Sequence, residues 1–161
     1  MTISVGDKLP EADFLVVGDN GPEAVSASSL FAGRKVVVFG VPGAYTATCT
    51  KEHVPSFVKT ADALAAKGVD EIVCISVNDP FVMASWGDST GAKDAGIRML
   101  ADPASSFTEA VGLTFDAPAA GFFKRSQRYS MLVEDGVVSK LNIEPARACT
   151  ISGGETILEQ I

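Results

Sequence analysis

One segment of the sequence combines a proline, a hydroxyl group and a thiol at spacings that suit nucleophilic chemistry. Pro42, Thr46 and Cys49 follow an apolar run and precede a pattern typical of a helix. A cysteine in the first turn of a helix meets unpaired backbone N–H groups and the positive end of the helix dipole, which both stabilise a thiolate. Thr46 can cap that helix or donate a hydrogen bond to an oxygen near the sulfur. The spacing indicates a reactive thiol, with a buried, inert cysteine as the alternative.

The flanking patterns place this segment at the carboxyl end of a buried strand. Residues 35–41 are apolar and largely β-branched without alternation, which is typical of a central parallel strand covered on both faces. Apolar residues over 54–65 recur at spacings of three and four, which predicts a helix that Pro55 kinks and that ends at Gly68. Strand-to-helix turns at this edge of a sheet are where α/β proteins bind ligands.

The remaining patterns predict an α/β domain with a mixed central sheet flanked by helices. A strand, a long helix and another strand imply a parallel pair with a right-handed crossover, and a closing hairpin adds antiparallel strands. No linker or repeat divides residues 1–161, so one domain is expected. The other predicted elements are a hairpin over 14–25, strands over 72–77 and 98–101, a helix begun by Asn78-Asp79-Pro80, a short helix over 107–111, a hairpin over 129–143 around Asp135-Gly136, and a last helix capped by Ser152.

Composition excludes several classes of function. The chain of 161 residues carries 13 basic and 20 acidic side chains, and its densest basic cluster is only Lys124, Arg125 and Arg128, so no nucleic-acid partner is expected. No apolar run approaches the roughly 18 residues of a membrane span, and the first residues do not resemble a signal peptide. One histidine and three widely spaced cysteines argue against a zinc site and favour a cytoplasmic protein with reduced thiols.

The motif Pro42-x-x-x-Thr46-x-x-Cys49 resembles the active-site signature of the peroxiredoxins, and its surroundings resemble the type II branch, which includes the atypical two-cysteine form. The resemblance spans nearly the whole chain. Further matches are His53-Val54-Pro55 with Phe57, residues 76–79, residues 125–128, Asp135-Gly136 and residues 141–144. Two positions depart from the branch, because Ala47 replaces a usual proline and Ser56 replaces a usual glycine.

This resemblance implies a thioredoxin-like fold and a thiol-dependent peroxidase that reduces hydrogen peroxide and alkyl hydroperoxides through a cysteine sulfenic acid. It implies that Cys49 is the peroxidatic cysteine, that Pro42 and Thr46 are its pocket partners, and that Arg128 is the family's arginine. Arg128 is a permanent cation with several donors, which suits it to hold the sulfur ionised and to stabilise charge on a leaving oxygen. Neither a metal nor an organic cofactor is required.

The resemblance also bears on partners and on the fate of the sulfenic acid. It implies thioredoxin or glutaredoxin with glutathione as reductant, and a homodimer with a contact near Phe81 to Trp86. Cys74 matches a second cysteine of plant members, but strand geometry puts it roughly 10 Å below Cys49, beyond the reach of a disulfide. Cys149 lies in the loop where the mammalian form has its resolving cysteine. An external thiol is favoured as the resolving group, and Cys149 is preferred to Cys74 among internal partners.

Several single residues fit more than one interpretation. His53 follows Cys49 by four residues, so a Cys–His hydrolase is an alternative, although a packed helix residue near the site fits better. Arg125 is either a surface charge or a support for Arg128. Trp86, with Phe81 and Met83 at helical spacing, is more typical of core packing than of an interface. A redox-signalling or scaffold protein that turns over poorly is the second class of function, which a turnover assay separates from the enzyme.

Overall fold

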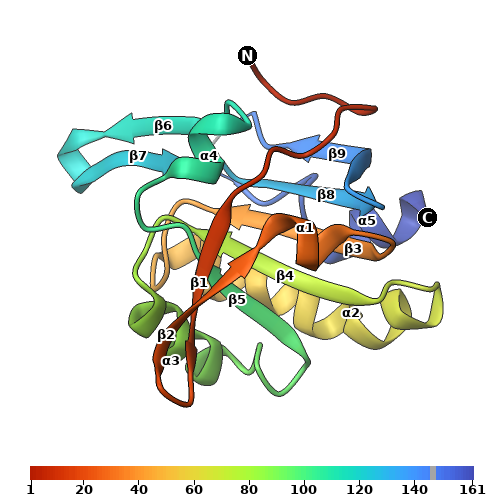
Figure 1. Ribbon diagram of the computed structural model, residues 1–161, viewed down its shortest axis with the longest axis horizontal. Coiled ribbons are helices and arrows are strands. Elements are labelled where there is room, and N and C mark those ends of the chain that lie inside the picture. Colours follow the sequence, from red (N-terminus) through yellow and green to blue (C-terminus); the bar gives the residue numbers. More distant parts are fainter. Residues whose placement is uncertain (146–147) are drawn as a thin grey trace.

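A seven-stranded mixed sheet forms the centre of the computed structural model, which describes residues 1–145 and 148–161 (Figure 1). Its strand order is β2-β1-β5-β4-β3-β8-β9, and a separate two-stranded sheet consists of β6 and β7. The strands are β1 (Asp13–Gly18), β2 (Gly21–Ser26), β3 (Lys35–Val41), β4 (Glu71–Ser76), β5 (Ile97–Ala101), β6 (Thr114–Ala117), β7 (Phe122–Ser126), β8 (Tyr129–Glu134) and β9 (Val137–Ile143). The helices are α1 (Ala27–Phe31), the π-helical turn η1 (Cys49–His53), α2 (Val54–Ala66), α3 (Pro80–Thr90), α4 (Ser106–Ala110), the 3₁₀ turn η2 (Pro118–Ala120) and α5 (Gly154–Gln160).

The central strands are parallel to one another and antiparallel to β8, the first strand of the closing hairpin, which confirms the predicted mixed sheet. β3 pairs in parallel with β4, and β4 with β5, whereas β8 runs antiparallel to β3. Side chains of β3 alternate between the two faces. Val36 and Val38 pack in a core that α1, α4 and the N-terminal segment cover. Val37 and Phe39 pack in a second core, which Cys49 and Cys74 share, under α2, α3 and α5.

The start of the long helix is irregular, and the cause is Pro55. Proline has no N–H to donate, and its ring clashes with the carbonyl four residues earlier in a regular helix. The chain accommodates it with the π turn η1, in which the N–H of Val54 donates to the carbonyl of Cys49, five residues back. The disturbance expected at Pro55 therefore falls on the turn that carries Cys49. The predicted helix end is confirmed, since Gly68 adopts φ +90° just after α2.

Three predicted caps and turns have different outcomes. Asp79 caps α3, because its side chain accepts a hydrogen bond of 2.9 Å from the N–H of Val82. Asp135 and Gly136 both have positive φ, as a two-residue hairpin turn requires. The prediction that Ser152 caps the last helix is wrong. α5 begins after Gly153, and the Ser152 hydroxyl instead donates to Glu144.

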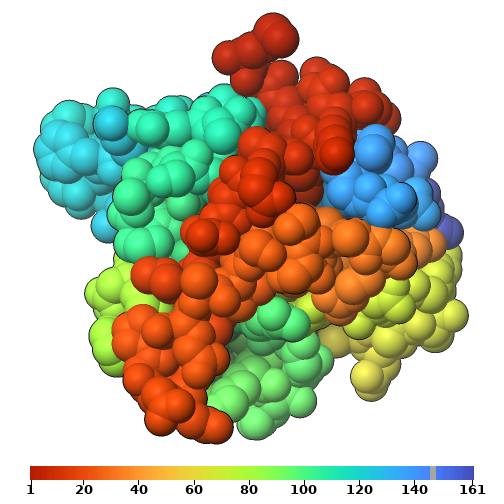
Figure 2. All heavy atoms as spheres, in the orientation of Figure 1, coloured from red at the N-terminus to blue at the C-terminus, as the bar shows by residue number. Residues whose placement is uncertain are grey.

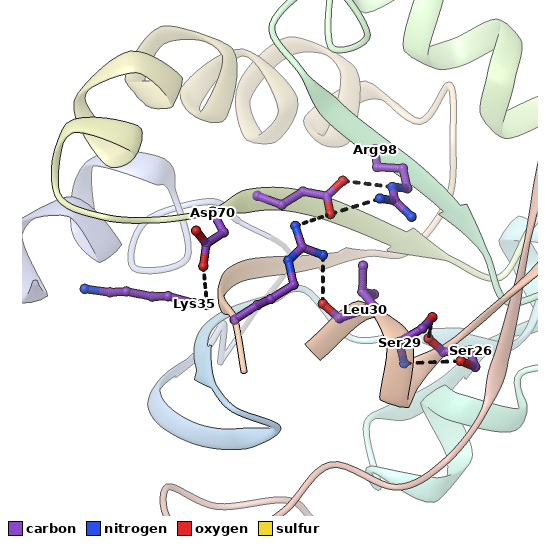
Figure 3. Close-up of polar contacts among 8 residues, drawn as sticks. Ser26, Ser29, Leu30, Lys35, Asp70 and Arg98 are labelled. Atoms are coloured by element: carbon purple, nitrogen blue, oxygen red, sulfur yellow. Dashed lines mark hydrogen bonds and ion pairs between the residues drawn. The ribbon is translucent and has the colours of Figure 1, made fainter. Parts of the chain in front are cut away.

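Charged side chains tie the amino ends of the central strands together, at the edge opposite the predicted active site. Glu71, at the start of β4, accepts hydrogen bonds from Arg34 at 3.0 Å and from Arg98 at 2.8 Å. Asp70 accepts from the backbone N–H of Lys35 at 2.8 Å. Figure 3 shows these contacts around the labelled Arg98, Lys35 and Asp70. Because hydrogen bonds between charged groups are short and strong, they fix the ends of β3, β4 and β5 relative to one another.

The hairpin β6–β7 and the short helix α1 were not predicted from the sequence. The hairpin projects from the body of the molecule as the cyan segment (Figure 1, Figure 2). Its strands have four and five residues, and the register shifts between Phe115 and Ala117, so no regular alternation marks them. None of the helices in the described ranges is long and apolar enough to cross a bilayer.

Candidate active site

The structure brings Cys49 and Arg128 together, although 79 positions separate them in the chain. Nη2 of Arg128 lies 3.1 Å from Sγ of Cys49. Cys49 is fully buried and Arg128 is only 7% exposed. Arg128 stands just before β8, which pairs with β3, and Cys49 lies in the turn that follows β3. The pairing of these two strands therefore places a permanent cation against the buried sulfur.

His53 holds the other end of the same guanidinium. Its Nδ1 lies 3.0 Å from Nη1 of Arg128, and its Nε2 lies 2.9 Å from the carbonyl oxygen of Ser152. An arginine only donates and a carbonyl only accepts, so Nδ1 is the acceptor and Nε2 carries the proton. Burial, reinforced by the charge of Arg128, lowers the pKa of His53 to about 3. The ring is neutral, and both of its nitrogens are engaged away from the sulfur, which removes the basis for a Cys–His hydrolase.

A cavity of about 390 Å³ opens beside Arg128. Two of the predicted pocket residues, Pro42 and Thr46, line it together with Arg128. The other lining residues are Ala47, Thr48, Phe115, Phe122, Gln127, Glu144 and Pro145. Within the described part of the chain, Nε of Arg128 is the single buried side-chain nitrogen or oxygen that lacks a hydrogen-bond partner. The guanidinium therefore contacts the sulfur through Nη2 and His53 through Nη1, while Nε has no partner in that part of the chain.

The turn before Cys49 is held by hydrogen bonds from several directions. The Thr46 hydroxyl donates to the carbonyl of Gly43 at 2.8 Å, so both predicted roles are wrong: it neither caps the helix nor donates to an oxygen near the sulfur. The N–H of Ala44 donates to the side chain of Asn78 at 3.0 Å. Tyr45 adopts φ +65°, a conformation that is uncommon for a residue other than glycine. With its hydrogen engaged at Gly43, the Thr46 oxygen keeps its lone pairs to accept a hydrogen bond.

Arg125 links the β6–β7 hairpin to this turn. Its Nη1 donates to the carbonyl of Pro42 at 3.0 Å, and its guanidinium lies 5.0 Å from the centre of the Phe122 ring. Neither predicted role was right, because Arg125 is no free surface charge and it contacts Pro42 rather than Arg128. Phe115 packs edge-to-face on Phe122, and both line the cavity. No pattern in the sequence marks this wall, because the short, irregular hairpin that carries it was not predicted.

Ser56, one of the two departures from the family pattern, has a definite role. Its hydroxyl donates to the carbonyl of His53 at 2.7 Å and accepts from the N–H of Gly154 at 3.0 Å. This side chain therefore ties α2 to the start of α5. The other departure, Ala47, lies in the wall of the cavity and leaves the reacting groups in place.

The two remaining cysteines, Cys74 and Cys149, take no part in the contact between Cys49 and Arg128. Cys74 is fully buried in β4, opposite Phe39 of β3. Burial, together with the nearby Cys49, raises the pKa of the Cys74 thiol well above its ordinary value. Cys149 is half-buried, and burial likewise raises its pKa. All three thiols are free. In the described residues, no cluster of histidine, cysteine and acidic side chains could hold a metal ion.

Comparisons with known proteins agree with this geometry. The family model described as Redoxin matches residues 4–158. Peroxiredoxin-2E-2, a chloroplastic protein of Oryza sativa subsp. japonica, is 44% identical over 99% of this chain and 73% of its own length. Peroxiredoxin-2B of Arabidopsis thaliana is 41% identical over 99% of this chain and 98% of its own length. The crystal structure of reduced Prx3 from Vibrio vulnificus, in complex with H2O2, matches with a TM-score of 0.93 and 44% identity over 99% of this chain and 96% of that chain.

Proposed function

This chain belongs to the peroxiredoxins, with the thioredoxin-like fold and the thiol-dependent peroxidase activity of that family, and we propose that Cys49 is the sulfur that attacks the hydroperoxide. The observation that carries the assignment is the 3.1 Å contact between Sγ of Cys49 and Nη2 of Arg128. A cation against the sulfur favours the thiolate, which is the nucleophilic form of cysteine. Arg128 also lines the cavity, so N–H groups of its guanidinium that are not engaged with Cys49 or His53 can donate to a substrate oxygen.

The proposed step transfers two electrons from sulfur to the peroxide. The thiolate of Cys49 attacks one oxygen of ROOH, an S–O bond forms, the O–O bond breaks, and the second oxygen leaves as RO⁻, which takes a proton from water to give ROH. Arg128 donates to the oxygens as negative charge moves across them. The Thr46 oxygen accepts the hydrogen of the attacked oxygen, and Pro42 forms part of the wall.

We propose hydrogen peroxide and alkyl hydroperoxides as substrates. The cavity wall formed by Phe115, Phe122 and Pro145 is apolar, which suits the hydrocarbon part of an alkyl hydroperoxide. Arg128 and Thr46, which line the same cavity, supply the polar groups that the reaction needs. Hydrogen peroxide needs only these polar groups, in keeping with the H2O2 bound by the Vibrio vulnificus relative.

We propose that an external thiol, from thioredoxin or from glutaredoxin with glutathione, reduces the sulfenic acid. The first thiol displaces water from the sulfenic sulfur and forms a mixed disulfide, and a second thiol releases Cys49. Cys74 is unsuited to this attack because it is buried within the sheet and its thiol stays protonated. Cys149 is the better internal candidate because it is half-buried in a loop near the site.

We further propose that the protein is a homodimer in the cytoplasm. Tyr45 and Phe81 are 52% and 59% exposed, and the hydroxyl of Tyr45 is hydrogen-bonded to Ser85 of α3. The two aromatic side chains therefore belong to neighbouring elements beside the active-site turn, and an apolar surface of this kind is typical of an interface. Trp86 and Met83, by contrast, are fully buried, as core packing predicts, whereas the same prediction is wrong for the exposed Phe81. Three thiols without a disulfide suit a reducing compartment.

The deciding experiment is a peroxide-consumption assay in which each reductant is supplied separately. Multiple turnovers with thioredoxin, or with glutaredoxin and glutathione, identify the physiological class of thiol. A single turnover that stops at oxidised Cys49 with every reductant would favour a redox-signalling protein over the proposed enzyme. Running hydrogen peroxide and tert-butyl hydroperoxide in parallel tests the proposed substrate range.

A further inference from the structure

Glu144 is a buried carboxylate that has no part in the proposed reaction step. It binds the loop segment 150–152, which precedes α5. It follows β9 directly and is 6% exposed. Its Oε2 accepts hydrogen bonds from three consecutive backbone N–H groups, those of Thr150 at 2.9 Å, Ile151 at 2.9 Å and Ser152 at 2.8 Å. The Thr150 hydroxyl donates to Oε1 at 2.8 Å, and the Ser152 hydroxyl donates to Oε2 at 2.7 Å. One side chain therefore fixes three residues of the loop.

These bonds keep Glu144 ionised. Burial alone raises the pKa of a carboxyl group, but the hydrogen bonds from Ser152, Ile151 and Thr150 outweigh burial and lower the pKa of Glu144 to about 2. An ionised acceptor forms stronger hydrogen bonds than a neutral one. The 150–152 segment is thus held by a charge, and not only by its own backbone.

The loop that Glu144 holds reaches Arg128 through His53. The carbonyl of Ser152 accepts the proton of His53 Nε2, and Nδ1 of that ring accepts from Nη1 of Arg128. The N–H of Glu144 donates to the carbonyl of Arg128 at 2.9 Å. A closed ring of contacts therefore runs from Glu144 through the loop and His53 to the guanidinium, and back to Glu144 through the backbone. Glu144 thus contacts the backbone of Arg128 directly and its guanidinium through Ser152 and His53.

We propose that Glu144 is a positioning residue for peroxide reduction, which fixes the guanidinium of Arg128 through the 150–152 loop and the His53 ring. The side chain of Arg128 has several rotatable bonds, and its guanidinium is held by Cys49 at Nη2 and by His53 at Nη1. If Ser152 moves, His53 loses its anchor and the guanidinium can turn away from the sulfur. A misplacement of about 1 Å in a reacting group can cost about a hundredfold in rate. The proposal rests on the proposed function of Cys49 and Arg128.

The test measures the second-order rate constant for oxidation of Cys49 by H2O2 in single-turnover experiments, with the oxidised peptide identified by mass spectrometry. Glu144→Gln keeps the shape of the side chain and removes its charge, and the expected loss is about tenfold. Glu144→Ala removes every acceptor, and the expected loss is about a hundredfold. Glu134→Gln is the matched control, because it makes the same change of charge on an exposed side chain and should leave the rate unchanged.

A double-mutant cycle with His53→Phe separates positioning from a general loss of structure. Phenylalanine keeps the aromatic contacts with Phe39 and Phe57, whose ring centres lie 4.9 Å and 5.6 Å from that of His53, and removes both ring nitrogens. If Glu144 acts through His53, Glu144→Gln has less than a twofold further effect in the His53→Phe background, because coupled residues are not additive. Near-UV circular dichroism verifies that each variant is folded.

Two results would overturn the proposal. The first is a folded Glu144→Gln protein whose rate constant with H2O2 matches that of the wild type. The second is a cycle in which the losses caused by Glu144→Gln and His53→Phe simply multiply, since independent structural effects behave in that way. If Glu144→Ala does not fold, Glu144→Gln still decides the question. A wild-type protein that does not react with H2O2 at all would instead contradict the proposed function itself.

Discussion

His53 Nδ1 accepts a hydrogen bond of 3.0 Å from Arg128 Nη1, and this contact fixes both the tautomer of the ring and the orientation of the guanidinium. The usual expectation for a histidine near a reactive cysteine is that it acts as a base. Here the ring is an acceptor for the arginine, and its remaining proton is committed to the carbonyl of Ser152. His53 therefore does not act as a base towards Cys49. It supports the guanidinium of Arg128.

The neutral state of His53 can be observed directly, because it is the single histidine of the chain. Its pKa, lowered to about 3 by burial and by Arg128, predicts that the ring does not titrate between pH 5 and pH 8. In a proton NMR titration the Hε1 resonance should hold its position over that range. A midpoint near the ordinary value of 6.5 would mean that the ring is exposed or that its contact with Arg128 is absent in solution.

The depressed pKa of Glu144 predicts a pH-dependent contribution to stability. A carboxyl whose pKa is lower in the folded than in the unfolded protein stabilises the fold above its unfolded pKa, and that contribution is lost as the pH falls. The loss should begin near pH 4.5 and be complete near pH 2. Urea unfolding of wild type and Glu144→Gln should thus differ most at pH 7, and the difference should shrink towards pH 2. A difference that is the same at pH 7 and pH 3 would contradict the ionised clamp.

Arg128→Lys tests whether the shape of the guanidinium matters beyond its charge. A lysine ammonium is a point charge and cannot reproduce the planar fork that donates to Cys49 and His53 while leaving a donor for the substrate. The loss of one preorganised donor is worth about 2.7–4 kcal/mol, so the rate with H2O2 should fall by about two to three orders of magnitude. Arg34→Lys, at the opposite edge of the sheet, is the matched control and should react at the wild-type rate. A near wild-type rate for Arg128→Lys would show that charge alone suffices.

Resolution by an external thiol predicts a specific product after one equivalent of peroxide. Without reductant, mass spectrometry should find Cys49 as a sulfenic acid that a trapping reagent captures, with Cys74 and Cys149 still reduced. The reason is that Cys74 is buried in β4, whereas Cys149 directly precedes the loop that Glu144 fixes. An intramolecular disulfide between Cys49 and Cys149 would overturn the external-thiol preference, and one between Cys49 and Cys74 would show that the helix start opens readily.

The sequence predicted those parts of the site that depend on local chemistry. The strand over 35–41, the helix that follows it and the position of Cys49 between them follow from hydrophobic periodicity and from proline and glycine placement. Arg128 could be assigned only through the resemblance to a family, because its contact with Cys49 depends on the pairing of β3 with β8. Periodicity in one strand does not reveal which strand lies beside it.

The supporting groups escaped prediction for a related reason. Glu144 binds backbone N–H groups of a loop, and any residue except proline presents such a group, so no side-chain pattern marks its partners. Arg125 binds the carbonyl of Pro42, which is equally invisible in the sequence. Ser152 was expected at a helix cap because serine favours that position, but the tertiary contact with Glu144 prevails. Contacts between side chains and distant backbone groups must be seen in three dimensions.

The central claim is that Cys49 is the nucleophile, and Cys49→Ser tests it most directly. The variant replaces one buried atom and should fold like the wild type, while Cys74→Ser serves as the matched change of another fully buried thiol. Peroxide consumption is measured for wild type and both variants with the reductant that supports turnover. We expect none above background for Cys49→Ser and near wild-type consumption for Cys74→Ser. Substantial peroxide consumption by a properly folded Cys49→Ser protein would contradict the account.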